Sequence, residues 1–378
     1  MFKKRRENEG KVFCIISPNV FRDIKGGTEI QTHFLGQELL RRGWSVHFIR
    51  ENQDQKGKTE VLDGVIVHSL PCRRAFMTWL NFVHLFKFMR RVRASAWYCR
   101  AARTYVFSAW LIARMTGGKV LWACSSEIYV SKNLGPKPSC RNIFIRWIQE
   151  FDKWLFLKAL RNIDFVVLQT QTQKMLLRQN WNIHGIVIRN GFPSISTTGG
   201  RRIPSLLWIG ALKKNKQPEK FIYLMKSLVE DGYQFYMIGK FKGPPEIMQS
   251  VREAEELYPN FKHLGEKEPG EIHSLLQQAR LLVHTSDYEG LPNVFIEAWL
   301  TGVPVISLKV DPDGMIQSHR LGRFSQSMDQ MLRDVKELMG DKSLWNEYSR
   351  NASHFAMENF HIQKNVGMLL RLTGLDDS

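Results

Sequence analysis

Strand-like and helix-like segments alternate along almost the whole chain, and the alternation starts twice. The first series opens with the apolar run Val12–Ser17, passes through the loop Lys25-Gly26-Gly27-Thr28 into a helix predicted over 28–42, and returns to a strand at Val46–Ile49. A second series opens with a strand predicted at Leu206–Ile209. Strand, glycine loop, helix and strand form the opening of a doubly wound α/β domain. We therefore expect two such Rossmann-like domains, which agrees with a length of 378 residues.

A stretch rich in Gly, Ser, Thr and Pro separates the two series and is typical of a linker. We expect an amino-terminal domain over 1–190, a linker over 191–201 and a carboxyl-terminal domain over 202–355. The last segment, 356–378, is expected to be a helix that crosses back to the first domain. Open α/β sheets bind ligands at the carboxyl ends of their strands. Two facing sheets would therefore share one site across a cleft.

Composition excludes several classes of protein. Hydrophobic residues make up 43% of the chain and charged residues 24%, which is ordinary for a folded globular protein. The five cysteines are too few for a disulfide scaffold and show no CxxC spacing, so a structural zinc site is not expected. No apolar run approaches 18 residues, and Val12–Ile16 is too short for the core of a signal peptide. These features predict a protein of the reducing cytoplasm.

The positive charge is confined to the first half of the chain. The formal net charge is +18, and residues 1–190 hold 32 Lys and Arg against 13 Asp and Glu. Between Asp63 and Glu127 there is no acidic residue, whereas ten Lys and Arg occur there. Such asymmetry indicates a polyanionic partner, either nucleic acid or the anionic face of a membrane.

Aromatic residues interleaved with this charge favour the membrane. The interface of an anionic bilayer suits aromatic rings that lie beside basic side chains. No nucleic-acid-binding motif accompanies the charge, so no nucleic-acid partner is predicted. A third reading, in which the apolar residues are core and the basic faces incidental, stays open. The aromatic residues concerned are Trp79, Phe82, Phe86, Phe88, Trp97, Tyr98, Trp110 and Trp122.

The most informative motif runs from Thr285 to Ala298, where a strand ends in a short loop that leads straight into a helix. The amide groups at the start of a helix lack intrahelical partners and carry partial positive charge, so they form a ready phosphate site. Glu289 and Glu297 bracket this loop. Carboxylates accept hydrogen bonds from the hydroxyl groups of a sugar or a ribose. Phosphate at the amides and hydroxyls at the carboxylates together indicate a sugar nucleotide.

This motif has seven residues between the two glutamates, Gly-Leu-Pro-Asn among them and Gly-x-Pro-Val after them. It resembles the signature of retaining GT-B glycosyltransferases, especially glycosyltransferase family 4 (group 1 glycosyl transferases). The resemblance covers about residues 11–372. It implies two Rossmann-like domains that face each other across a cleft. Further landmarks in the family's order are Gly26-Gly27-Thr28-Glu29, Leu39 to Val46, Gln169 to Lys174, Ile188 to Gly191, Trp208-Ile209-Gly210, Lys216 to Glu219, Met237-Ile238-Gly239 and Leu264-Gly265.

The resemblance also implies roles for individual residues. Glu297 would hold the ribose hydroxyls, and Glu289 would contact the donor sugar. Gly27 would offer its amide to the diphosphate from the first domain. Lys216 would neutralise charge on the leaving diphosphate, where a positioned cation stabilises the transition state. The amides implied to contact the sugar and diphosphate are those around Gly290, Leu291, Asn293 and Val294.

Two positions depart from the family pattern. The family usually has Arg directly after the glycine that matches Gly210, but this chain has Ala211. Lys213 or Lys214 could supply the missing cation, although Lys lacks the bidentate geometry of Arg. Many members also carry a His after the strand that matches Lys119–Ala123. Here Ser125, Ser126 and Glu127 follow that strand, and we expect them on the acceptor side or in a structural cap.

No metal or other cofactor is expected. Asp311-Pro312-Asp313-Gly314 has the spacing for a divalent cation on a diphosphate, but its residues are also those of a turn. We favour the turn, because GT-B enzymes generally do not need an aspartate-bound metal.

The sequence thus predicts a retaining, hexosyltransferase-type enzyme that moves a sugar from a nucleotide-diphosphate sugar to a lipid-linked or glycan acceptor, in polysaccharide or glycolipid synthesis. It would be cytoplasmic and peripheral at the inner face of the membrane. A catalytically degenerate sugar-nucleotide-binding protein, motivated by Ala211, and a sugar-nucleotide epimerase are the alternatives. The sugar, the base, the acceptor and the linkage depend on the shape of the pocket.

Overall fold

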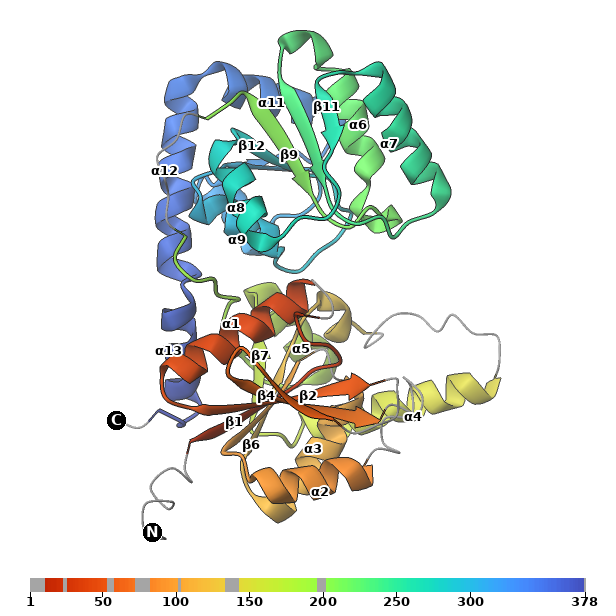
Figure 1. Ribbon diagram of the computed structural model, residues 1–378, viewed down its shortest axis with the longest axis vertical. Coiled ribbons are helices and arrows are strands. Elements are labelled where there is room, and N and C mark those ends of the chain that lie inside the picture. The colour runs from red at the N-terminus through yellow and green to blue at the C-terminus, as the bar shows by residue number, and fades with distance from the viewer. Residues whose placement is uncertain are drawn as a thin grey trace. The chain divides into compact units, whose positions relative to one another are not determined.

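The computed structural model of the chain describes residues 11–22, 26–52, 58–71, 82–100, 103–132, 143–195 and 202–376. The chain forms two compact units. Unit 1 consists of residues 1–193 and 362–378, and unit 2 of residues 194–361. Each unit is a largely parallel sheet covered by helices on both faces (Figure 1). The predicted α/β class with two Rossmann-like domains is confirmed.

Unit 1 is built on a sheet with the strand order β3-β4-β2-β1-β5-β6-β7-β8. Its neighbouring strands run parallel, except that β3 pairs antiparallel with β4. The strands are β1 (Val12–Ile16), β2 (Ser45–Asn52), β3 (Thr59–Leu62), β4 (Val65–Pro71), β5 (Ala96–Arg100), β6 (Lys119–Ala123), β7 (Phe165–Leu168) and β8 (Ile186–Val187). The helices are α1 (Gly27–Arg41), α2 (Phe82–Val92), α3 (Arg103–Thr116), α4 (Ile143–Leu160), α5 (Gln171–Trp181) and α13 (Ile362–Leu372).

The two faces of the unit 1 sheet form separate cores. Along β1, Phe13 and Ile15 belong to a cluster with residues of α1 and α13. Cys14 and Ile16, which point to the other face, belong to a cluster with residues of α2, α3 and α4. Successive side chains of a strand alternate between faces, so a continuous apolar run is what a strand covered on both sides requires. Helices α1 and α13 lie side by side although they are far apart in sequence (Figure 1).

Several aromatic residues that we expected at a membrane surface lie in this core. Trp97 is fully buried, Trp122 is 1% exposed and Tyr98 is 4% exposed. They lie on the central strands β5 and β6, which helices cover on both faces. Trp79 lies outside the described residues. For these strand residues, the interpretation as core is therefore the correct one.

Unit 2 has the strand order β11-β10-β9-β12-β13-β14, with all neighbours parallel. Figure 1 shows α6 and α7 on one side of this sheet and α8 and α9 on the other. Its strands are β9 (Ser205–Ile209), β10 (Gln234–Ile238), β11 (Phe261–His263), β12 (Leu281–His284), β13 (Val305–Ser307) and β14 (Gly322–Phe324). Its α-helices are α6 (Pro218–Lys226), α7 (Pro245–Leu257), α8 (Pro269–Gln278), α9 (Asn293–Leu300), α10 (Met315–Ser318), α11 (Met328–Gly340) and α12 (Lys342–Asn359).

The strand order reverses at one place in each sheet. In unit 1 the chain moves outward from β1 through β2 to one edge, and from β5 through β6 to the other. In unit 2 the same reversal lies between β9 and β12. Ligands of open α/β sheets bind outside the carboxyl ends of the strands at this switch point. The loops that follow β1, β5, β9 and β12 are therefore the places to examine for a site.

The return of the chain to unit 1 begins later than position 356. Residues 342–359 form one continuous helix, α12, which packs against α9 of unit 2. The division between units falls at Ile362, where α13 begins.

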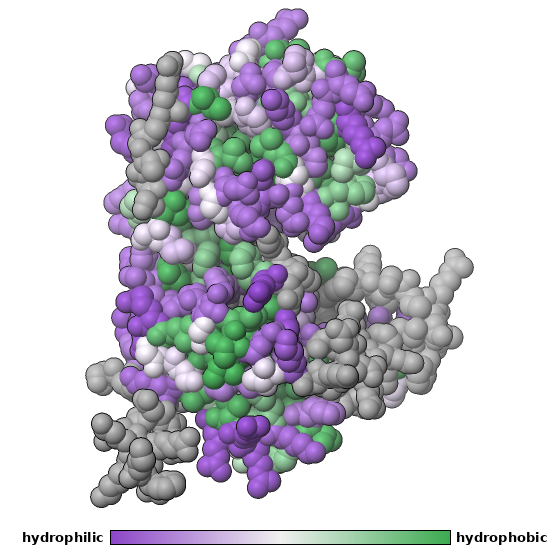
Figure 2. Space-filling model, in the orientation of Figure 1, coloured by the Kyte–Doolittle hydropathy of each residue, from purple (hydrophilic) through white to green (hydrophobic). Residues whose placement is uncertain are grey.

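Hydrophilic residues dominate the visible face of unit 2 (Figure 2). Within the described ranges, no helix combines the length and apolarity needed to cross a membrane.

Candidate functional site

Two loops meet at the switch point of unit 2, one after β9 and one after β12. The first contains the short 3-10 helix η3 (Lys214–Lys216), and the second carries the predicted Glu289. The ammonium group of Lys216 donates a hydrogen bond to the Glu289 carboxylate. The structure thus brings together two residues that are 73 positions apart in sequence and that the sequence assigned to one site.

The hydroxyl of Thr285 connects these loops. Its Oγ1 lies 2.8 Å from the main-chain carbonyl oxygen of Lys216 and 2.9 Å from that of Gln217. The same oxygen accepts a hydrogen bond from the indole Nε1 of Trp208 at 2.8 Å. A second link joins the amide of Asp287 to the carbonyl oxygen of Asn215 at 3.1 Å. The backbone that carries Lys216 is therefore held to the end of β12 by several bonds.

Gln217 shows that the first loop is held in an uncommon conformation. Its φ angle is +50°, in the left-handed region that residues with side chains rarely adopt. The following residue is Pro218, which begins α6. The side-chain Nε2 of Gln217 donates to Asp287 Oδ2 at 2.9 Å. Such strain persists only where the surroundings enforce it, and it is concentrated at functional sites.

The electrostatic environment of Lys216 is mixed. Burial, followed by the positive charge of Lys213, lowers the pKa of Lys216 from 10.5 to about 8. The Glu289 carboxylate acts in the opposite direction, because a neighbouring opposite charge favours the protonated amine. Both side chains remain about one-fifth exposed. Lys216 is therefore a cation that a ligand can reach and that is poorly solvated without one.

The loop after β12 leads into α9, which begins at Asn293. Leu291 is buried, and the neighbouring Gly290, Asn293 and Val294 are half-buried. The positive end of the helix dipole therefore lies in the loop that carries Glu289. Glu297 lies one turn further along α9 and is 8% exposed. Its Oε1 is 3.3 Å from Nε2 of His273 on α8, so one carboxylate oxygen is held in place.

Glycines end the strands beside this site and let their backbones approach closely. Gly210 and Gly239 directly follow β9 and β10. The φ angle of Gly239 is +145°, and a Cβ atom there would lie 1.8 Å from the carbonyl oxygen of Gly210. Any other residue at position 239 would therefore displace the backbone. Both glycines belong to the landmarks of the family resemblance.

His284 is a residue of this site that sequence reasoning missed. It ends β12, is 4% exposed, and neither ring nitrogen has a hydrogen-bond partner. Burial, followed by the charge of Lys216, holds the pKa of His284 well below its usual range. The ring packs edge-on against Phe295, with 4.7 Å between ring centroids. A histidine inside an otherwise apolar strand was the available signal.

The remaining predicted residues belong to unit 1. Gly27 is the first residue of α1. Ser125, Ser126 and Glu127 follow β6, are half-buried, and lead into the 3-10 helix η2 (Glu127–Tyr129). Ser126 occupies the cap position of η2, but its side chain makes no capping hydrogen bond. The roles of these four residues toward donor and acceptor stay predictions.

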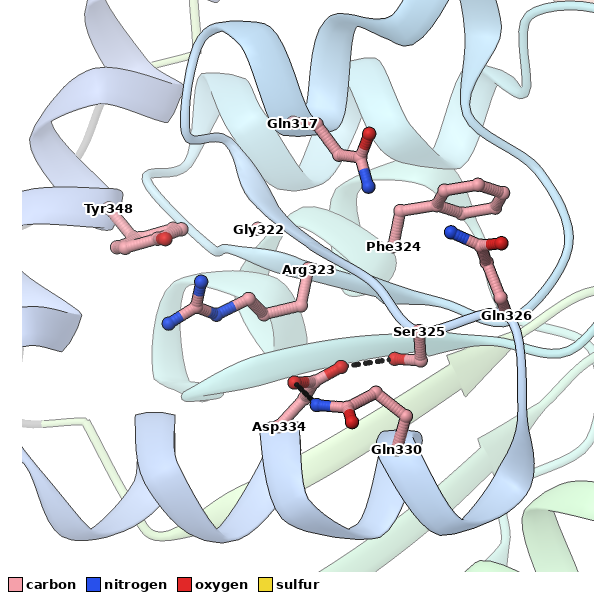
Figure 3. Close-up of a pocket in the computed structure, with 9 residues that line it drawn as sticks. All are labelled: Gln317, Gly322, Arg323, Phe324, Ser325, Gln326, Gln330, Asp334 and Tyr348. Carbon is pink, nitrogen blue, oxygen red and sulfur yellow. Dashed lines mark hydrogen bonds between the residues drawn. The ribbon is translucent and has the colours of Figure 1, made fainter.

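A separate cavity lies at the β14 edge of unit 2 and contains none of the predicted site residues (Figure 3). Its volume is about 410 Å³. The buried Asp334 carboxylate accepts from Ser325 Oγ at 2.6 Å and from Gln330 Nε2 at 2.8 Å. Both oxygens of the Asp334 carboxylate therefore already accept hydrogen bonds from side chains of the protein. The cavity is lined by Gln317, Gly322, Arg323, Phe324, Ser325, Gln326, Gln330, Asp334 and Tyr348.

Residues 203–341 match the family model described as "Glycosyl transferases group 1". Unit 2 is similar to this family. The matched segment contains Lys216, Glu289 and Glu297, which is where the geometry above is concentrated. Among curated proteins, no relative matches the chain.

Solved structures resemble the whole chain. Sucrose-phosphate synthase from Thermosynechococcus elongatus is 17% identical, with a TM-score of 0.74 over 96% of this chain and 98% of that one. A glycosyltransferase from Rickettsia africae is 14% identical, with a TM-score of 0.72 over 97% and 99%. HepE of Anabaena, solved in complex with UDP and glucose, is 13% identical, with a TM-score of 0.70 over 96% and 99%. The chain has the GT-B fold.

Proposed function

We propose that this protein is a retaining glycosyltransferase that moves a sugar from a nucleotide-diphosphate sugar to a lipid-linked or glycan acceptor. The Lys216–Glu289 pair carries the proposal, because it sets a cation and a carboxylate side by side at the switch point of unit 2. The group 1 match over this unit and the glycosyltransferases among the neighbours support it. HepE, whose structure holds UDP and glucose, supports a sugar-nucleotide donor.

In the proposed mechanism, the nucleotide binds to unit 2. Glu297 accepts hydrogen bonds from the ribose hydroxyls, and the first turn of α9 binds the diphosphate. Glu289 contacts hydroxyls of the donor sugar. The ammonium group of Lys216 is paired with Glu289 in the structure. It contacts the diphosphate as the bond to the sugar breaks. A cation at this position stabilises the negative charge that develops on the leaving group.

Retention follows if the acceptor attacks the face that the nucleotide leaves. The bond from the anomeric carbon to the phosphate oxygen breaks, and a bond to the acceptor oxygen forms on the same face. The departing phosphate takes the proton of the acceptor hydroxyl. This scheme requires no nucleophile from the protein and no bound metal.

We also propose that unit 1 holds the protein at an anionic membrane, on the cytoplasmic side. An exposed aromatic stripe on α4 supports this part: Trp147 is 65% exposed, Phe151 39% and Trp154 54%. Their rings stack in sequence, with 5.8 Å between neighbouring centroids. The Lys158 ammonium lies 5.1 Å from the Trp154 ring centroid. Aromatic side chains next to cations match the headgroup region of a bilayer.

One sequence of experiments tests the activity. A thermal-shift screen against nucleotide-diphosphate sugars would identify the donor, because a ligand that binds the folded state raises its stability. The donor is then incubated with candidate acceptors, with and without a chelator. The proposal predicts acceptor-dependent release of the nucleoside diphosphate, unchanged by the chelator, and a product that keeps the anomeric configuration in NMR spectra. Inversion would contradict the retaining mechanism, a product of unchanged mass would indicate epimerisation, and donor binding without turnover would indicate a degenerate site.

A further inference from the structure

The switch point of unit 1 contains a buried arginine. Arg100 is the last residue of β5 and is 7% exposed. The neighbouring strand β1 ends one position earlier in register, since Ile16 is paired with Cys99, and Ser17 follows it. Arg100 and Ser17 thus lie at the carboxyl ends of the two strands between which the strand order reverses. This is where a doubly wound sheet binds its ligand.

The hydrogen bonds of Arg100 leave most of its donors unused. Nη1 donates to the hydroxyl of Tyr98 at 3.2 Å, and Nη2 donates to Oδ1 of Asn190 at 2.7 Å. Its buried Nε has no partner. Across the part of the chain that the structure describes, no carboxylate forms an ion pair with Arg100. A guanidinium has five N–H donors and always carries its charge. Burying such a cation without an anion is costly.

Neighbouring elements contribute further buried polar groups that lack partners. Ser17 is 2% exposed, and its Oγ makes no hydrogen bond. Gln31 of α1 is 4% exposed, and its Nε2 makes none, while its Oε1 accepts from the amide of Gly191 at 3.0 Å. Gly191 directly follows Asn190, the partner of Arg100. Unused donors from β5, α1 and the end of β1 thus belong to one connected region of unit 1.

We infer that Arg100 binds a phosphate group of the acceptor. A guanidinium matches phosphate with two parallel hydrogen bonds, and Nε with one Nη is a common pair of donors for it. Sequence composition agrees, because no acidic residue occurs between Asp63 and Glu127. This stretch, which contains Arg100, therefore supplies no carboxylate that would compete for the cation. The inference rests on the proposed function, since it assigns the acceptor a chemical class.

Phosphate titrations of the full chain test the assignment. A saturating nucleoside diphosphate is added first, so that the proposed donor site in unit 2 is occupied. Inorganic phosphate, glycerol phosphate or short-chain phosphatidic acid below its micelle concentration is then titrated by calorimetry. The variants are Arg100→Met and Arg100→Lys, and the matched control is Arg114→Met, which changes an exposed arginine of α3. Thermal unfolding of each variant establishes that it is folded.

We expect Arg114→Met to bind each of the three probes with the affinity of the wild type. Arg100→Met should weaken binding about 10- to 100-fold, as the loss of charge-assisted hydrogen bonds predicts. Arg100→Lys keeps the charge without the paired donors, so its affinity should fall between the two. Tighter binding of phosphatidic acid than of glycerol phosphate would assign the group to a lipid-linked acceptor, and the reverse to a soluble one.

Two results would overturn the inference. One is equal phosphate affinity in wild type and folded Arg100→Met or Arg100→Lys. The other is the absence of any phosphate binding beyond the nucleotide-occupied site. The first step, nucleoside diphosphate binding to the wild type, reports on the proposed function by itself. Failure there and failure at Arg100 are therefore distinguishable.

Discussion

The hydroxyl oxygen of Thr285 lies 2.8 Å from the main-chain carbonyl oxygen of Lys216 and so connects the end of β12 to the loop that carries the candidate catalytic cation. This contact involves the main chain of Lys216 and not its side chain. It sets where the Lys216 backbone lies, and therefore where its ammonium group can reach. The position of Lys216 depends on a buried neutral hydroxyl as well as on the ion pair with Glu289.

Replacing Thr285 with Val should loosen this loop. The change leaves the indole N–H of Trp208 without its acceptor in the interior, so the free energy of unfolding should fall by about 1–3 kcal/mol. Turnover should fall as well, because Lys216 is no longer held. Chemical denaturation and initial rates measure the two effects. Thr285→Ser keeps the hydroxyl and serves as the control; a Val variant with wild-type stability and rate would show that the link is dispensable.

Removing the charge of Lys216 should affect turnover more than donor affinity. The negative charge on the diphosphate grows as the sugar departs, so the cation matters most in the transition state. Lys216→Ala should lower kcat by a factor on the order of 10² to 10³. Lys226→Ala, which removes an exposed lysine at the end of α6, is the control. If both variants turn over normally, Lys213 or another cation performs the task.

The pH dependence of the reaction should report on the same group. The pKa of Lys216 is lowered to about 8, so the free enzyme loses the charge as pH rises through that value. We therefore expect kcat/KM to fall above pH about 8. In the donor complex the diphosphate favours the protonated amine, so kcat should fall at higher pH. Lys216→Arg should move the kcat/KM decline to more alkaline pH; an unchanged profile would assign it to a different group.

Glu297 offers a test of nucleotide recognition. If its carboxylate holds the ribose, Glu297→Ala leaves the ribose hydroxyls unpaired and should weaken donor binding by about 1–3 kcal/mol. Calorimetry with the identified nucleotide measures the change. Glu256→Ala alters an exposed glutamate of α7 and provides the comparison. Unchanged affinity in a folded Glu297→Ala protein would remove Glu297 from the site.

Membrane attachment should have separable aromatic and electrostatic parts. Replacing Trp147, Phe151 and Trp154 with Ser removes exposed rings, so vesicle binding should weaken while the fold is retained. Replacing the exposed Arg90, Arg91 and Arg93 with Ser should weaken it too, since each basic residue near an anionic surface contributes about 1 kcal/mol. Co-sedimentation with anionic and neutral vesicles measures both variants.

The electrostatic part should decrease with salt, because the Debye length is about 8 Å at physiological ionic strength. A parallel titration with duplex DNA controls for general attraction to polyanions. Nucleotide binding by unit 2 should be unaffected in both variants. If the wild type binds neutral and anionic vesicles equally, or binds neither, the electrostatic account fails.

The sequence predicted the fold well where strands are long and apolar. The strands predicted at Val12–Ser17 and Leu206–Ile209 agree with β1 and β9 to within one residue at each end. The edge strands β3 and β14 were missed, since each is at most four residues long and lacks a continuous apolar run. Such strands are defined by pairing with a neighbour rather than by their own residues.

Burial was harder to predict than secondary structure. Trp97 and Trp122 occur in sequence among basic residues, as interfacial aromatic residues do. Only the sheet order shows that they lie on central strands. The spacing of Trp147, Phe151 and Trp154 at four and three positions could have revealed a single helix face. In the site, Glu289 was found from the loop motif and Lys216 by resemblance. Thr285 and Arg100 were not, because their importance lies in hydrogen bonds to residues distant in sequence.

Helix α13 has a consequence for biosynthesis. Its residues Ile362, Val366 and Leu369 complete the apolar cluster on one face of the unit 1 sheet. The ribosome releases this helix after all of unit 2, which is one continuous segment of the chain. Domains fold as units as they emerge. Unit 1 is therefore completed only after unit 2 has been synthesised, and the part of its sheet face that α13 covers is what a chaperone would need to protect in the meantime.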